Sequence, residues 1–192
     1  MLKITALGLE RENRQLFSNL TFKIKTGTLV YVSGPNGSGK SSLLRILAGL
    51  CLPSAGERYW EGEVYYLGHK LGLQLALSPR ENLNIWLKLW GVEGDIGSAL
   101  AALELQDLAE VPCENLSRGE CQRVALAALW LDPPLCWILD EPFTGLDKKG
   151  IEVVCERLTE HLQKGGIVLM ATHQLFSIVS PHSLEIALGT SI

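Results

Sequence analysis

The sequence predicts an α/β fold with a mainly parallel sheet, and three observations lead to this fold class. Strand-like and helix-like segments alternate toward both ends of the chain. A glycine-rich loop at 34–41 separates a predicted strand from a predicted helix, the usual place for a phosphate-binding loop. The stretch at 78–131 is mostly helical and is expected to be an insert in this pattern. No repeat or linker interrupts the 192 residues, so we expect one domain at 1–192.

The composition fits a globular protein with a large core. Hydrophobic residues make up 47% of the chain, enough to form a core without disulfides or structural metals. The formal net charge of −4 argues against a general nucleic-acid-binding protein. The five cysteines are odd in number and form no CxxC pair, which predicts free thiols in a reducing compartment. No apolar run approaches the roughly 18 residues of a membrane span, and no signal-peptide pattern opens the sequence.

The first predicted elements flank the glycine-rich loop. Apolar and polar residues alternate over 20–24, which predicts a half-buried strand. The β-branched run at 28–33 predicts a central strand. An apolar helix is expected from Ser41 to Leu50, with Pro53 and Gly56 beyond its end.

The middle of the chain contains a predicted hairpin and then a predicted helix. Segments 58–60 and 64–67 are strand-like and flank Glu61-Gly62, which favours a short hairpin. Residues 78–81 read Ser-Pro-Arg-Glu, a capping box with proline at the first helical position. One apolar face follows at helical spacing, made of Leu83, Trp86, Leu87 and Trp90.

The last third of the chain returns to the α/β pattern. A buried strand is expected at 135–139, a helix at 148–163 and another strand at 167–171. With the strand at 28–33, these segments supply the mainly parallel sheet.

The glycine-rich loop matches the phosphate-loop pattern G-x-x-x-x-G-K-[ST]. Backbone N–H groups of such a loop hold phosphate oxygens, the lysine reaches the β- and γ-phosphates, and the serine ligates Mg²⁺. We assign the lysine role to Lys40 and the metal role to Ser41, and expect Lys40 to have no structural partner without nucleotide. The predicted nucleotide contacts are Gly34, Pro35, Asn36, Gly37, Ser38, Gly39, Lys40, Ser41 and Ser42.

The predicted strand at 135–139 leads into two carboxylates, Asp140 and Glu141. Strands often end in acidic residues, so this pair alone would carry little weight. Beside a phosphate loop the pair has a specific use, because one carboxylate can order Mg²⁺ while the other polarises the attacking water. We assign the metal role to Asp140 and the role of general base to Glu141.

Ser117 opens a predicted helix that continues through Leu131. Ser117 and Glu120 have the spacing of a capping box, so an ordinary helix start explains this segment when it is taken alone.

Five motifs in a fixed order resemble those of the ATP-binding subunits of ABC transporters, over essentially the whole chain. They are the phosphate loop, LSRGE at 116–120, ILDEP at 138–142, GLD at 145–147 and ATH at 171–173. The resemblance implies a P-loop NTPase of ABC type that hydrolyses ATP with Mg²⁺. Its mainly parallel core sheet would carry a short antiparallel β-subdomain and a helical insert at about 78–131.

The same resemblance implies roles for residues outside the phosphate loop. Ser117 and Gly119 would contact the γ-phosphate of an ATP held by a second copy of the chain. Asp147 would belong to the loop between the two sites of a homodimer. His173 would be the switch histidine on the γ-phosphate.

Further segments resemble one branch of the family, the ATP-binding subunit of the bacterial cytochrome c maturation transporter, a haem exporter. They include NLTF at 19–22, YLGH at 66–69 and THQ at 172–174. This branch implies a peripheral protein at the cytoplasmic face of the inner membrane that works with integral membrane subunits and binds no nucleic acid. ATP hydrolysis would power haem delivery or export.

Several positions depart from the general ABC pattern. His69 replaces the glutamine that touches Mg²⁺ and the attacking water, and we count it with the catalytic residues. The aromatic residue that stacks on adenine is missing at 12–14, which leaves Arg14 and Phe17 as candidates. Arg118 occupies a signature position that is usually glycine.

Two other function classes share parts of this pattern. A soluble ABC-type ATPase of DNA repair would need a long coiled-coil insert, yet no sustained heptads lie between Lys40 and Ser117. An ABC-type ATPase of translation would normally carry two ATPase halves, which 192 residues do not hold. A phosphate-loop kinase would need neither the Ser117 motif nor His173.

Overall fold

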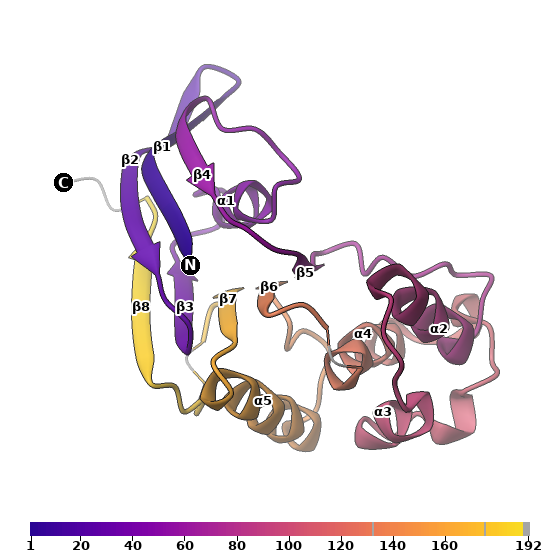
Figure 1. Cartoon of the computed structure of the whole chain (residues 1–192). Helices are drawn as coiled ribbons and strands as arrows, with labels where there is room; N and C mark the ends of the chain where they lie inside the picture. The colour runs from indigo at the N-terminus through magenta and orange to yellow at the C-terminus, as the bar shows by residue number, and fades with distance from the viewer. Residues whose placement is uncertain (132, 175, 190–192) are drawn as a thin grey trace.

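A computed structural model of the chain describes residues 1–131, 133–174 and 176–189. Two sheets organise it: a parallel sheet in the order β5-β6-β7-β3-β8, and an antiparallel sheet in the order β2-β1-β4 (Figure 1). The strands are β1 (Leu2–Arg11), β2 (Arg14–Ile24), β3 (Thr28–Ser33), β4 (Ala55–Tyr59), β5 (Val64–Leu67), β6 (Cys136–Asp140), β7 (Ile167–Ala171) and β8 (His182–Ala187). The α-helices are α1 (Lys40–Leu47), α2 (Pro79–Trp90), α3 (Ile96–Ala102), α4 (Arg118–Ala127) and α5 (Lys148–Gln163). The fold is therefore the predicted α/β class.

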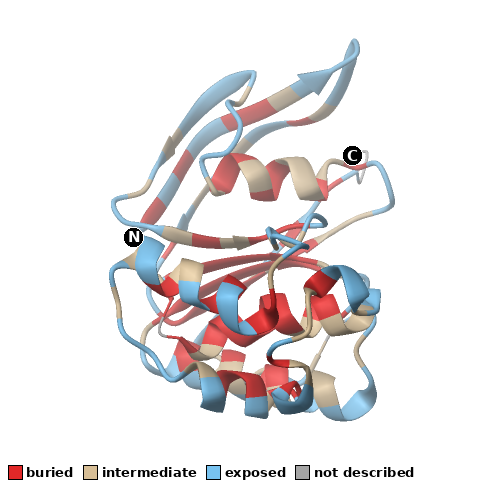
Figure 2. Cartoon of the chain, turned by 90° about the vertical axis from the view of Figure 1, so that its right-hand side faces the viewer, coloured by how far each residue is buried: buried red, intermediate tan, exposed pale blue. Residues whose placement is uncertain are grey.

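The centre of the parallel sheet is covered on both faces. Every residue of β6 and β7 is buried, as expected of strands with helices on either side. Along β6 the side chains alternate between two cores: Ile138 packs with α1 and the antiparallel sheet, whereas Trp137 packs with α4 and α5. Figure 2 shows α1 between the two sheets and the other helices on the opposite side of the parallel sheet.

The predicted hairpin at 58–67 is wrong. β4 pairs antiparallel with β1, whereas β5 pairs in parallel with β6, so the chain passes from one sheet to the other between them. The parallel pairing buries Tyr65 and Leu67, and the Tyr65 hydroxyl donates a hydrogen bond to the carbonyl of Ala125 at 2.7 Å. A local hairpin would leave these side chains without that core.

Several predicted bounds are confirmed and two helix ends are not. The strands at 28–33 and 167–171 and the helix at 148–163 have the expected bounds. α1 ends at Leu47 rather than Leu50, because Gly49 adopts a left-handed φ of 77° and the chain turns back. α4 ends at Ala127 and a 3₁₀ turn follows at 128–130 instead of a helix through Leu131.

The helical insert packs on the parallel sheet through an aromatic cluster. The predicted capping box and first-turn proline of α2 are present, and its apolar face contains Trp86 and Trp90. The two indoles stack at 6.2 Å between centroids, and Tyr65 of β5 meets each of them edge-on. Both indoles are half-buried, so they contribute to the core without being fully enclosed in it.

Two predictions from the composition can be compared with the fold. All five cysteine thiols are free in the part of the chain that the structure describes. In the same part of the chain, none of the helices has the length and apolar character that a membrane crossing requires.

Candidate nucleotide-binding site

The phosphate loop joins the carboxyl end of β3 to α1. Gly34 has a φ of 142°, and a Cβ atom there would lie 2.4 Å from the Leu188 carbonyl oxygen, so only glycine fits. Gly39 precedes α1 with a φ of 100° and provides no side-chain cap for the helix. The first backbone N–H groups of α1 are thus available to an anion, and they face the pocket lined by Gly39, Lys40 and Ser41.

Lys40 is held by the loop itself. Its side chain is buried, and its Nζ donates hydrogen bonds to the carbonyl oxygens of Gly34 at 2.8 Å and Pro35 at 3.1 Å. The expectation that Lys40 has no structural partner without nucleotide is therefore wrong. A tight loop turns some carbonyl groups inward, and a buried ammonium must satisfy its donors on the nearest acceptors.

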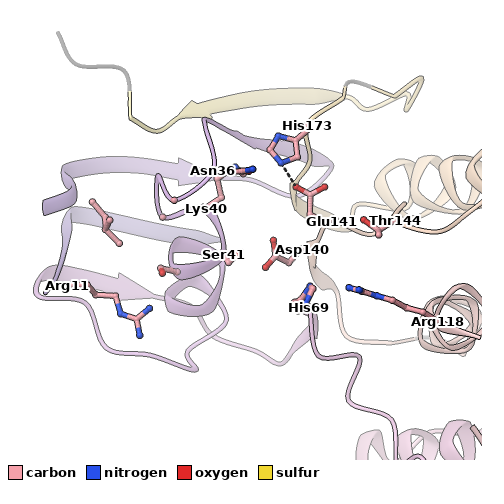
Figure 3. Close-up of a pocket in the computed structure, with 14 residues that line it drawn as sticks. Arg11, Asn36, Lys40, Ser41, His69, Arg118, Asp140, Glu141, Thr144 and His173 are labelled. Atoms are coloured by element: carbon pink, nitrogen blue, oxygen red, sulfur yellow. Dashed lines mark ion pairs between the residues drawn. The ribbon is translucent and has the colours of Figure 1, made fainter. Parts of the chain in front are cut away.

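The paired carboxylates stand at the carboxyl end of β6. Asp140 is buried, and Glu141 follows it in a left-handed conformation with a φ of 53°. The Glu141 N–H donates to the Ala171 carbonyl of β7 at 2.9 Å, which extends the pairing of the two strands by one residue. The strained backbone turns the Glu141 side chain toward His173, whose Nε2 lies 3.4 Å from Glu141 Oε1 (Figure 3).

The surroundings of Glu141 shift the pKa of its carboxyl group in opposite directions. Burial raises the pKa of the Glu141 carboxyl, and the charge of Asp140 adds to the increase. His173 and the Lys40 ammonium pull the same pKa back in part. The net pKa is raised, so Glu141 accepts a proton more readily than an exposed glutamate.

These groups line one pocket of about 580 Å³. The predicted site residues that line it are Asn36, Gly37, Gly39, Lys40, Ser41, Ser42, His69, Asp140, Glu141 and His173. Gly34 lies within the loop, while Pro35 and Ser38 line a neighbouring groove together with residues of β2. His69 is exposed just after β5 and lies across the pocket from Lys40 (Figure 3).

Three predicted site residues from outside the phosphate loop do not line this pocket. Ser117 caps α4, with its Oγ accepting from the Glu120 N–H at 3.2 Å, as the capping-box interpretation expects. Asp147 caps α5 by accepting from the Gly150 N–H at 2.8 Å. Gly119 lies against Gly145, where an added Cβ would be 2.9 Å from the Gly145 carbonyl oxygen. Each has a structural role within one chain, and their contacts with a second chain stay predictions.

The sequence interpretation missed some residues of the pocket and misjudged others. Arg118 and Thr144 line it, and the only signal for Arg118 was its unusual place in the signature. Neither candidate for the missing aromatic residue lines it: Phe17 is buried in the core, and Arg14 faces the neighbouring groove. Arg11 and Leu16 line the pocket instead.

Asp140 and Ser41 suit a magnesium ion that a nucleotide brings with it. Among the described residues, no three histidine, cysteine, aspartate or glutamate side chains gather closely enough to form a complete metal site. Mg²⁺ commonly takes only one or two protein carboxylates and fills its shell with water and phosphate oxygens. One buried carboxylate and one hydroxyl beside a phosphate loop match that requirement.

Residues 17–144 match the ABC transporter family, so the chain belongs to this family and is an ATP-binding ATPase of the ABC type. It is 42% identical to the cytochrome c biogenesis ATP-binding export protein CcmA of Pseudomonas fluorescens (strain Pf0-1), over 98% of this chain and 96% of that protein. An ABC transporter ATP-binding subunit of known structure has a TM-score of 0.83 and 25% identity, covering 91% of this chain and 80% of that one. The dimeric ATP-binding cassette MJ0796, bound to ADP and Pi, has a TM-score of 0.80 and 26% identity, covering 91% and 88%.

These comparisons confirm the predicted family and branch. An ATPase of DNA repair or translation is not favoured, because the relatives with high identity over nearly full length are named export proteins.

Replacing Lys40 with alanine tests the phosphate loop. We expect ATP affinity to fall roughly 10- to 100-fold, because hydrogen bonds to charged groups contribute about 1.5–3 kcal/mol. Thermal stability should fall slightly, since two bonds to the loop carbonyls are also lost. Calorimetric titration and thermal melting measure the two effects. Lys148→Ala is the control, because that side chain is 94% exposed and does not line the pocket. Unchanged ATP affinity in a folded Lys40→Ala protein would contradict the assignment.

Replacing Glu141 with glutamine tests the burial of its carboxyl. The raised pKa means that the folded state binds this proton more tightly than the unfolded state, so its stabilising effect is lost as pH rises. Glutamine does not titrate, and nucleotide-free Glu141→Gln should therefore melt above the parent protein at pH 8. The difference should shrink as the pH approaches the ordinary glutamate pKa. Glu156→Gln, at an exposed position outside the pocket, is the control for removing a carboxylate elsewhere. A melting difference that is constant between pH 5 and 8 would count against this account.

Proposed function

We propose that this chain hydrolyses Mg²⁺-ATP to power a membrane transporter of cytochrome c biogenesis, with haem as the species delivered or exported. One observation carries the catalytic part: Lys40, Asp140, Glu141 and His173, from three separate segments, line one pocket at the carboxyl edge of the parallel sheet. The transport part is supported by the near full-length similarity to relatives named as cytochrome c biogenesis export proteins.

The residues of the pocket have different roles in ATP hydrolysis. The phosphate loop and Lys40 bind the β- and γ-phosphates, and Ser41 with Asp140 hold the Mg²⁺ that neutralises phosphate charge. Glu141 takes a proton from the attacking water, a role that its raised pKa favours. His173, within 3.4 Å of Glu141, orients that carboxylate and reaches the γ-phosphate. His69 lies on the opposite side and completes the surroundings of the water.

We further propose a homodimer with ATP at its interface. The relative MJ0796 has a dimeric structure. In this chain Ser117 is exposed at the start of α4 and outside its own pocket, so it is available to a nucleotide on a second copy. Gly119 and Asp147 lie in the same region, linked through the contact of Gly119 with Gly145. The three residues would close over the partner's ATP.

The membrane partners would dock on the helical insert. We propose that the single domain 1–192 lies at the cytoplasmic face of the bacterial inner membrane as a peripheral protein. The α2 face with Trp86 and Trp90 would receive a helix of an integral membrane subunit. Incomplete burial of both indoles supports this proposal, because each leaves aromatic surface that a partner can cover.

Glu141→Gln tests hydrolysis and dimerisation together. Glutamine keeps the shape of the side chain but cannot accept a proton, so turnover should fall roughly 10²- to 10⁴-fold. It also removes a negative charge beside the γ-phosphate, which favours a closed dimer. Size-exclusion chromatography should give about twice the 21.1 kDa mass with ATP and the monomer mass without it. Wild-type turnover would eliminate Glu141 as the base, and an ATP-bound monomer would contradict the proposal of an interfacial site.

Trp86→Ala tests the docking face. The tagged chain is captured from bacterial membranes, and co-purifying membrane proteins and haem absorbance are measured. We expect Trp86→Ala to lose these partners while stability falls by roughly 1–3 kcal/mol. Leu87→Ala is the matched control, because Leu87 is buried on the same helix and its truncation should lower stability without loss of partners. Retained partners in Trp86→Ala, or losses that only follow melting temperature, would contradict docking there.

A further inference from the structure

Glu141 stands on a loop just beyond β6 rather than within the strand. Its φ of 53° is left-handed, and Pro142 follows it directly. The backbone of a residue before proline is restricted, and an unusual conformation there persists only where the surroundings hold it. On the N-terminal side the hold is the hydrogen bond from the Glu141 N–H to the Ala171 carbonyl. The contacts on the other side then decide where the carboxylate points.

On that other side the loop is held by a side chain of α4. The Gln122 Nε2 donates a hydrogen bond to the Pro142 carbonyl at 3.0 Å, although the two residues are 20 positions apart in the chain. Both residues are buried, and Gln122 is only 8% exposed. Glutamine is mostly exposed in proteins, so a buried one generally has a specific partner. Without the amide, the Pro142 carbonyl would lose that partner at a place that water does not reach easily.

α4 contacts the same loop at a second point. Gly119, in its first turn, lies so close to Gly145 that an added Cβ atom would be 2.9 Å from the Gly145 carbonyl oxygen. Phe143, between these two points, packs on Phe176 with ring centroids 3.9 Å apart. The loop is thus supported along its length, and Gln122 is the support that bonds to the residue next to Glu141.

We propose that Gln122 is a positioning residue for ATP hydrolysis, which directs the Glu141 carboxylate toward the attacking water by holding the Pro142 carbonyl. This inference rests on the proposed role of Glu141 as the base. Gln122 does not line the pocket, so it acts through Glu141 rather than on the nucleotide. A misplacement of about 1 Å can lower a rate about 100-fold, so the loss of a bond one residue from the base is large enough to measure.

Gln122→Met tests this role, because methionine is unbranched, flexible and of similar length but has no hydrogen-bond donor. Kinetics and calorimetry give kcat, the KM for ATP and the affinity for ADP. We expect kcat to fall roughly 10- to 100-fold while KM and ADP affinity stay as in the parent, since only the base is displaced. If Gln122→Met does not fold, Gln122→Asn, whose amide is one methylene shorter, is measured with the same expectation.

Tyr65→Phe is the matched control. It removes a buried hydrogen bond of 2.7 Å to the Ala125 carbonyl, which belongs to the same helix but does not lead to Glu141. We expect it to lower the melting temperature as Gln122→Met does and to leave kcat unchanged.

A double variant separates positioning from stability. If Gln122 acts only through Glu141, its substitution has no further effect once the base is gone. Gln122→Met combined with Glu141→Gln should therefore turn over ATP as slowly as Glu141→Gln alone, which single-turnover assays measure.

Three results would overturn the proposal: a parental kcat in folded Gln122→Met, an equal loss of kcat in Tyr65→Phe, or losses that multiply in the double variant. Parental turnover in Glu141→Gln would reject the proposed base and this inference together. Slow turnover in Glu141→Gln with a parental kcat in Gln122→Met would reject the role of Gln122 alone.

Discussion

The hydrogen-bonded pairing of β3, β7 and β6 is the constraint on which the rest of the structure depends. Parallel strands end at the same edge of a sheet, so the loop after β3, the carboxylates after β6 and His173 after β7 meet there although they are distant in sequence. The hydrogen bond from the Glu141 N–H to the Ala171 carbonyl continues the pairing of β6 with β7 as far as the general base. The left-handed backbone of Glu141 directly follows the fully buried β6, and its N–H is tied to the equally buried β7.

The carboxyl edge of the parallel sheet also brings basic and acidic side chains together in the pocket. Lys40 is held on the carbonyl groups of its own loop and stays close to the carboxylate side of the pocket. Burial raises the pKa of Glu141, while Lys40 and His173 limit the increase. A carboxyl group in this position remains able to ionise and is still a better proton acceptor than an exposed glutamate. The site thus obtains its chemistry from partial burial, which the covered faces of the parallel sheet impose.

The antiparallel sheet and the helical insert contribute residues to different ends of the pocket (Figure 3). The antiparallel sheet packs on α1 and brings Arg11 and Leu16 to the flank of the phosphate loop. The helical insert packs on the other face of the parallel sheet through Tyr65, Trp86 and Trp90, and it carries Arg118 to the opposite end. A nucleotide at the centre of the pocket would therefore lie between residues of the antiparallel sheet and a residue of the helical insert.

The sequence by itself determined the segments whose signals are local. The phosphate loop, the capping boxes at Ser78 and Ser117, and the strands and helix at 28–33, 148–163 and 167–171 depend on short-range patterns, and they were predicted closely. The tertiary structure alone decided which strands pair. β5 joins β6 instead of forming a hairpin, because only that pairing buries Tyr65 and Leu67. It also decided that Phe17 is buried while Arg11 lines the pocket, and that Lys40 binds its own loop. The strand pairing depends on contacts between residues that are distant in the chain, and the Lys40 contacts depend on the folded shape of the loop. Local propensity encodes neither.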